Sequence, residues 1–219
     1  PTEHASMEDY LGCKVSFLKQ CDNVVLYSDT RYFETIYNEV RDKHVVVYGS
    51  KESIEKLMSR DDDFFEKDTD FASIHNEDLT DHNSYFELIY GGENRAYNTN
   101  LIGDYNVENI VAAIISSLLI GIPNDQIRSS IRDVYVPGRL QVYHWKDRTF
   151  MIDYAHNYIS MYRLYEMVKK TMKPKSITVV FGCGGERYKK RREDMGRLAE
   201  QYADKVVLTM EDPGFESCE

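Results

Sequence analysis

The chain has 219 residues, of which 42% are hydrophobic and 29% are charged, and its formal net charge is −10. This composition is typical of a soluble globular protein and allows one large hydrophobic core or two small ones. The negative charge disfavours a nucleic-acid partner, which needs a basic surface, and no apolar run approaches the roughly 20 residues of a membrane-spanning helix. Four cysteines without a Cys-x-x-Cys pair indicate reduced thiols and a cytoplasmic location rather than a zinc ribbon or a disulfide framework.

Residues 1–134 alternate between predicted helices and strands, which is the pattern of an α/β protein. Ser6 is the expected N-cap of the first helix, the Gly91-Gly92 pair supplies a turn, and Gly121 ends the longest helix. The predicted order is a helix at 6–19, a strand at 23–27, a helix at 30–41, a strand at 44–48, a helix from Ser50 or Ser53 to 59, a loop at 60–70, a small antiparallel element at 71–98, and helices at 104–120 and 123–134.

The Pro137-Gly138-Arg139 segment interrupts this pattern and is the predicted boundary between two domains. The residues after it predict a hairpin followed by a parallel α/β arrangement of strand, helix, strand, helix and strand. The predicted elements are the two hairpin strands at 140–145 and 149–152, a helix at 158–171, a strand at 177–181, a helix at 191–202 and a strand at 205–209.

A glycine-rich loop joins the predicted strand at 177–181 to the next helix through Gly182, Gly184 and Gly185. Glycines at the carboxyl end of a parallel strand let backbone N–H groups approach an anion. The spacing matches neither GxGxxG nor GxxxxGK[ST], and a tight turn before a solvated helix is an equally weighted alternative. A basic run then opposes the helix dipole, which favours contact with an anion: Arg187, Lys189, Lys190, Arg191 and Arg192.

Two asparagines, Asn106 and Asn109, lie three residues apart at the start of the longest helix and so share one face. An asparagine at a helix start usually caps it, and that interpretation is favoured for each residue alone. Two carboxamides on one face also suit a purine edge, because an amide both donates and accepts hydrogen bonds.

Asp153 and His156 follow a predicted strand directly before a helix. Taken alone, Asp153 is a helix cap and His156 a polar surface residue. Lys14 lies within a half-apolar helix, where an extended lysine with its charge in solvent is the simplest explanation. Near it, three residues offer metal ligands, although solvated acids at a helix start are the favoured interpretation: His4, Glu8 and Asp9.

Together these segments resemble, in a fixed order, the Mur ligase family, of the MurE type (UDP-N-acetylmuramoyl-tripeptide synthetases). The resemblance runs from about His4 to Pro213. It implies a partial central ATP-binding domain at 1–136 and the N-terminal part of a Rossmann-like C-terminal ligase domain at 137–219. The segments that carry it are EHASMEDYLGCKVSFL, GDYNVENIVAAI, VPGRLQVY, IDYAHN and VVFGCGGERYKKRREDMGRLAEQYADKVVLTMEDP.

The resemblance implies an ATP-dependent ligase that uses Mg²⁺ and adds an amino acid to UDP-N-acetylmuramoyl-dipeptide through an acyl phosphate. Lys14 matches a lysine that is carbamylated, and a carbamate oxygen suits magnesium. Lys14 and His156 are the implied catalytic residues. The residues implied for ATP are Asn106 and Asn109 at the adenine, Asp153 at the ribose or adenine, and Arg139 and His156 near the phosphates.

The implied site for the incoming amino acid consists of Arg187, Glu211 and Asp212. Family members usually carry Asp-Asn-Pro-Arg here, whereas this chain has Glu-Asp-Pro-Gly ending at Gly214. The missing arginine disfavours diaminopimelate as the acceptor and leaves lysine or another amino acid open.

Three other family features do not occur in the sequence: a Walker-type phosphate loop, the N-terminal UDP-binding domain, and an acid–histidine metal pair expected before Pro1. We therefore expect a fragment that is inactive alone and requires the missing N-terminal region of the same protein. The alternatives are a Mur-ligase-like protein with a different amide-forming or partner-dependent role, and a binding module that does not use a nucleotide.

Overall fold

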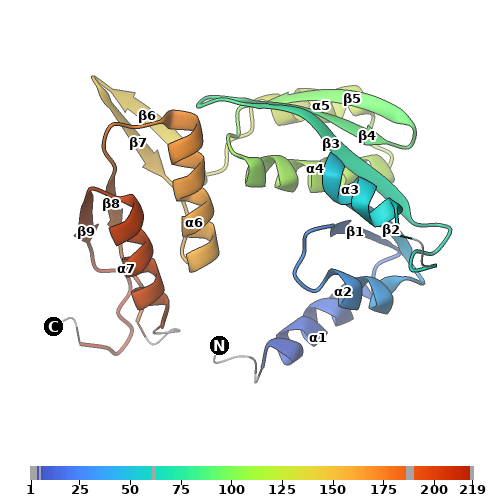
Figure 1. Ribbon diagram of the computed structural model, residues 1–219, viewed down its shortest axis with the longest axis horizontal. Helices are drawn as coiled ribbons and strands as arrows, with labels where there is room; N and C mark the ends of the chain where they lie inside the picture. Colours follow the sequence, from blue (N-terminus) through green and yellow to red (C-terminus); the bar gives the residue numbers. More distant parts are fainter. Residues whose placement is uncertain (1–3, 5, 61–62, 186–189, 218–219) are drawn as a thin grey trace. The chain divides into compact units, whose positions relative to one another are not determined.

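The computed structural model describes residues 4, 6–60, 63–185 and 190–217. The described chain contains two compact units, an N-terminal unit at Ser6–Tyr135 and a C-terminal unit at Val136–Glu219 (Figure 1). Within the described residues, no helix is both long enough and apolar enough to cross a lipid bilayer.

The N-terminal unit contains one five-stranded sheet with the strands in sequence order. The first three strands pair parallel and the last three antiparallel. The antiparallel element predicted at 71–98 is confirmed, and its first strand also pairs parallel with β2. The strands are β1 (Asn23–Tyr27), β2 (His44–Ser50), β3 (Asp70–Leu79), β4 (Ser84–Tyr90) and β5 (Glu93–Thr99).

Strand β2 supplies side chains to hydrophobic cores on both faces of this sheet. Val45 and Val47 pack in the core formed with the first three helices, whereas Val46 and Tyr48 pack in the core formed with the next two. Alternation of side chains along a strand produces this division. The helices are α1 (Met7–Leu18), α2 (Phe33–Val40) and α3 (Lys51–Met58) for the first core, and α4 (Asp104–Leu119) and α5 (Asn124–Arg132) for the second.

Three of the predicted helix ends are confirmed. The Asp9 backbone N–H donates to Ser6 Oγ at 3.2 Å, which caps α1. Ser50 rather than Ser53 caps α3, because its Oγ accepts from the Ser53 N–H at 3.1 Å. Gly121 follows α4 with a φ of 82°, a left-handed conformation that glycine adopts at low cost.

The C-terminal unit contains a two-stranded antiparallel hairpin and a two-stranded parallel sheet. Met161, Tyr165, Met195 and Leu198 form its core, between the two helices. Helix α6 continues into one π-helical turn at Val168–Met172. The elements are β6 (Gln141–Trp145), β7 (Arg148–Ile152), α6 (Tyr158–Met167), β8 (Thr178–Phe181), α7 (Lys190–Tyr202) and β9 (Lys205–Leu208).

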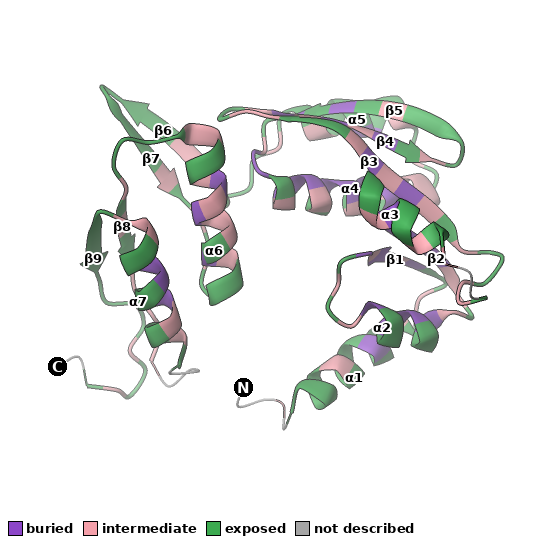
Figure 2. Cartoon of the chain, in the orientation of Figure 1, coloured by how far each residue is buried: buried purple, intermediate pink, exposed green. Residues whose placement is uncertain are grey.

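The sequence predicted three parallel strands in this unit, and this prediction is wrong for the first of the three, β7. β8 and β9 pair parallel, whereas β7 pairs only with β6 among the described strands. The short turn between β6 and β7 lets each strand satisfy the backbone groups of the other locally. Most residues of this hairpin are exposed, as Figure 2 shows in green, so little burial ties β7 to the parallel pair.

Replacement of Ile114 by alanine should destabilise the N-terminal unit. Ile114 on α4 is 0% exposed, so the change leaves a cavity and should cost about 2–5 kcal/mol of unfolding free energy. Urea denaturation would measure the loss. The matched control is Ile120→Ala, at a side chain that is 76% exposed, and it should cost about 0.5 kcal/mol or less. Equal losses in the two variants would contradict this placement of α4.

The stability of the C-terminal unit should fall at alkaline pH. The hydroxyl of Tyr202 donates to Glu166 Oε1 at 2.8 Å, which raises the pKa of Tyr202 to about 12, and burial raises the pKa of Tyr165 to about 12. In an unfolded chain, the pKa of tyrosine is about 10. The contribution of these two tyrosines to the free energy of unfolding is therefore complete below about pH 10 and is lost as the pH rises toward about 12. Urea denaturation between these values should show a shallower pH dependence for Tyr202→Phe than for Tyr143→Phe, an exposed control.

Candidate functional site

Lys14 lies on the exposed side of α1, and its ammonium contacts an aromatic ring. The Nζ atom is 5.4 Å from the centroid of the Tyr10 ring, one helical turn earlier. This is the geometry of a cation–π contact, which an exposed lysine makes at little cost. The structure thus places the Lys14 side chain at the surface beside Tyr10, and its role as a carbamate remains a prediction.

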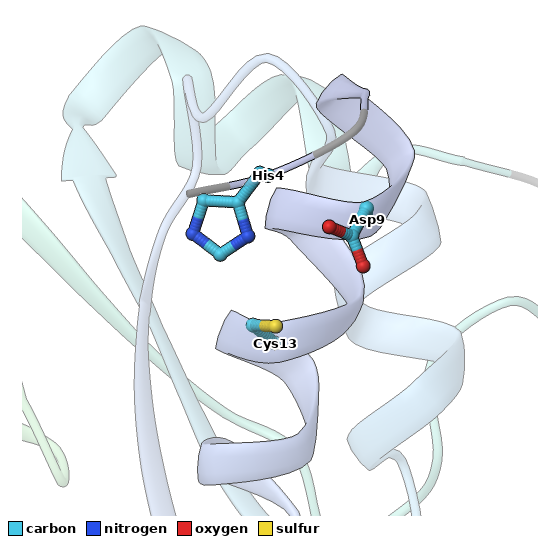
Figure 3. A group of neighbouring side chains, drawn as sticks. All are labelled: His4, Asp9 and Cys13. Atoms are coloured by element: carbon cyan, nitrogen blue, oxygen red, sulfur yellow. The ribbon is translucent and has the colours of Figure 1, made fainter. Parts of the chain in front are cut away.

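A group of three possible metal ligands lies at the start of α1 (Figure 3). Ligand atoms of His4, Asp9 and Cys13 all lie within 4.8 Å of one another. His4 and Asp9 were predicted as possible ligands from the sequence, whereas Cys13 was not, although its spacing of four from Asp9 places both on one helix face. Glu8, which the sequence analysis included, is not part of this group. A hydrogen bond with Ser6 lowers the pKa of the Glu8 carboxyl.

This group fits magnesium only in part. Magnesium prefers oxygen ligands, and Asp9 is the only one of the three that offers a carboxylate. The imidazole and the thiol suit softer ions. A carbamate on the neighbouring Lys14 would add the oxygen ligands that a hard cation needs.

The two asparagines of α4 differ in exposure. Asn106 is 8% exposed, and its Nδ2 donates to the Ile102 carbonyl at 2.8 Å. Asn109 is exposed one turn later. Neither caps the helix, because α4 begins after Gly103 and that cap makes no side-chain hydrogen bond. The favoured cap interpretation was therefore wrong, and Asn109 is the asparagine whose amide is open to a ligand.

Arg139 and His156 both contact the aromatic ring of Tyr154. The Arg139 guanidinium carbon is 4.5 Å from the ring centroid of Tyr154. The His156 and Tyr154 ring centroids are 4.9 Å apart, and His156 Nδ1 lies 3.0 Å from the Tyr154 carbonyl oxygen. Two predicted phosphate-side residues are therefore brought together by the paired ends of the β6–β7 hairpin, where Gln141 faces Ile152.

Asp153 joins the two segments that carry this group. Its carboxylate accepts hydrogen bonds from the Leu140 N–H at 3.0 Å and the Ala155 N–H at 2.8 Å. The cap interpretation of Asp153 was wrong, because Asn157 caps α6 in a reciprocal pair with Ser160. Asp153 therefore fixes the loops on which Arg139 and His156 lie, whatever it contacts in a ligand.

The predicted amino-acid site brings together the loops that follow β8 and β9. The Gly185 N–H donates to the Asp212 carbonyl at 2.8 Å, and a Cβ at Gly182 would lie 2.6 Å from the Thr209 carbonyl oxygen. Glu211 and Asp212 are exposed. Arg187 lies outside the described residues.

Gly214 is the residue at which the resemblance to the family predicts an arginine. Its φ is 59°, a left-handed conformation that disfavours residues with a Cβ. Its N–H donates to Asp212 Oδ1 at 3.1 Å, which turns that carboxylate toward its own loop. A residue with a Cβ at this position would therefore strain the turn.

Sequence reasoning missed Tyr154, the aromatic centre of the Arg139–His156 group. A signal was present, because Tyr154 stands between Asp153 and His156 in the motif itself. Its contact with an arginine 15 positions earlier depends on strand pairing, which motif spacing does not express.

Comparison with known families accounts for both units. Residues 2–117 match the Mur ligase middle domain, and residues 138–219 match the Mur ligase, glutamate ligase domain. The chain belongs to the Mur ligase family.

Particular relatives match along almost the whole chain. It is 32% identical over 218 residues to the UDP-N-acetylmuramoyl-L-alanyl-D-glutamate–2,6-diaminopimelate ligase of Aquifex aeolicus (strain VF5), covering 99% of this chain and 41% of the relative. It is 30% identical over 219 residues to the corresponding L-lysine ligase of Enterococcus faecalis (strain ATCC 700802 / V583), with coverages of 99% and 41%. The chain thus spans about two-fifths of the length of these relatives.

A solved structure supports the fold. MurF from Acinetobacter baumannii superposes with a TM-score of 0.70 at 18% identity, over 95% of this chain and 44% of that one. The resemblance at this identity concerns architecture alone. It agrees with the mixed α/β fold expected from the sequence.

Removal of the Asp153 carboxylate should loosen the loops around Tyr154. Asp153→Ala leaves the Leu140 and Ala155 N–H groups without this acceptor and should cost about 1–3 kcal/mol of unfolding free energy. Urea denaturation of the purified chain would measure it. Glu200→Ala, at an exposed position on α7, is the control and should cost about 0.5 kcal/mol or less. An Asp153 variant as stable as this control would refute the bridging role.

Proposed function

We propose that this chain is part of an ATP-dependent ligase that adds the third amino acid of the stem peptide to UDP-N-acetylmuramoyl-L-alanyl-D-glutamate, in peptidoglycan synthesis. The observation that carries the proposal is the match over 99% of the chain to two ligases named for this step. The reaction takes place in the cytoplasm.

Three of the described residues fit a nucleotide in chemical type. Asn109 offers an exposed amide for adenine, and Arg139 and His156 offer a cation and an imidazole beside Tyr154. Fixed positive groups of this kind stabilise charge that develops on phosphate oxygens. ATP, when bound, supplies the phosphoryl group that activates the substrate carboxylate as an acyl phosphate.

Magnesium binding is proposed for the start of α1. Lys14, as a carbamate, supplies oxygen ligands, and Asp9 lies on the same helix. The role of these residues is to hold a cation that offsets phosphate charge. His156 and Lys14 are the residues to which we assign catalysis.

The proposed acceptor is an amino acid held by Arg187, Glu211 and Asp212. The two relatives are named for different acceptors, diaminopimelate and L-lysine, so similarity alone does not choose between them. Gly214 leaves no arginine side chain for the second carboxylate of diaminopimelate. This favours L-lysine or another acceptor with one carboxylate.

The chain alone should not ligate, because its 219 residues contain no Walker-type loop to hold the triphosphate. A hybrid that joins it to the N-terminal region of the Aquifex aeolicus relative should release phosphate only when the UDP-dipeptide and an amino acid are both present. Phosphate release and the mass of the UDP product would measure this. L-Lysine should support a faster rate than diaminopimelate.

Two controls make this assay decisive. Lys14→Ala in the hybrid should reduce the rate by about 100-fold, whereas Lys56→Ala, at an exposed position on α3, should not change it. Ligation by the 219-residue chain alone would contradict the requirement for a further region. A hybrid that binds the UDP-dipeptide but never consumes ATP in response to an amino acid would contradict the proposed function.

A further inference from the structure

The loops after β8 and β9 carry a contact that the family comparison does not assign. We propose that Arg192 and Glu216 are positioning residues that hold the acceptor segment, residues 209–214, against the glycine loop, residues 182–185. Only the name "acceptor segment" rests on the proposed function, since the contacts are properties of the C-terminal unit alone.

The two loops pack at backbone distance. A Cβ at Gly185 would overlap the Pro213 carbonyl, and a Cβ at Gly182 would lie 3.0 Å from the Glu211 nitrogen. The Gly185 N–H donates to the Asp212 carbonyl at 2.8 Å. The glycines therefore do more than permit a turn, because each makes room for the backbone of the acceptor segment.

Arg192 spans both loops from the first turn of α7. Its Nη2 forms an ion pair with Glu216 Oε2 and lies 3.4 Å from the Gly184 carbonyl oxygen. The Glu216 side chain is only 22% exposed. A carboxylate that has lost most of its hydration is stabilised by a fixed guanidinium.

Glu216 transmits this contact to the acceptor segment. Its N–H donates to the Pro213 carbonyl at 3.1 Å, one residue before Gly214, and the Gly214 N–H donates to Asp212. The turn that presents Asp212 is thus held at both ends, by Gly185 and by Glu216.

This contact also explains part of the basic run at the start of α7. Cations there oppose the helix dipole, and the sequence analysis expected an anion as compensation. For Arg192, the anion is Glu216 of the same chain. The proposal therefore gives Arg192 an intramolecular partner and leaves Arg187 for the acceptor.

The test is amide hydrogen exchange in the 219-residue chain, followed by mass spectrometry. Arg192→Gln and Glu216→Gln should each speed exchange at Gly185 and across residues 209–217 by about fivefold. The matched control is Arg197→Gln, which removes an ion pair with Glu193 on the same helix and should leave these amides unchanged. Circular dichroism of each variant would confirm that α6 and α7 remain folded.

A variant in which the two charges are exchanged tests whether the ion pair itself holds the two loops together. The double variant R192E/E216R restores the ion pair with reversed signs and should return exchange to within about twofold of the original chain. No acceleration in either single variant, or equal acceleration in the Arg197 variant, would overturn the proposal. So would a double variant that exchanges faster than both single variants.

The same variants in the hybrid ligase connect this contact to function. Arg192→Gln should raise KM for the amino acid about tenfold while KM for ATP stays within about twofold. Equal changes in both constants would overturn the positioning role. An inactive hybrid combined with the expected exchange pattern would count against the proposed function and leave the contact supported.

Discussion

Burial of β2 on both faces is the constraint on which the N-terminal unit depends. Val45 and Val47 enter one core and Val46 the other, so helices must cover both sides of the sheet. β1 and β3 pair with β2 from either side in parallel. The helix α4, which carries Asn106 and Asn109, is placed by this requirement rather than by any ligand.

In the C-terminal unit, one carboxylate and one ion pair each hold two loops together. Asp153 joins the segment before β6 to the segment after β7, and Arg192 joins the loop after β8 to the one after β9. In both places, the residues assigned to a ligand lie on loops whose shape is set by neighbouring polar contacts. Such supporting contacts keep a site close to its working geometry before a ligand arrives.

The sequence predicted the elements well because the signals are local. Ser6 and Ser50 cap helices through bonds within one turn, and Gly121 ends α4 through its own conformation. The sequence could not predict that, among the described strands, β7 pairs only with β6, since alternating patterns do not specify partners. Nor could it predict that Asn106 turns to the Ile102 carbonyl or that Tyr154 lies under Arg139, because both contacts depend on backbone placement.

The left-handed backbone at Gly214 has a consequence for substitution at this position. A side chain at this position would cost about 1–2 kcal/mol in conformational strain, and the N–H bond to Asp212 would have to adapt as well. Introducing an arginine at this position is therefore not a neutral step, because the turn must be rebuilt first. Main-chain shape and side-chain identity are thus coupled at this position, so a single codon change alters the turn as well as the side chain.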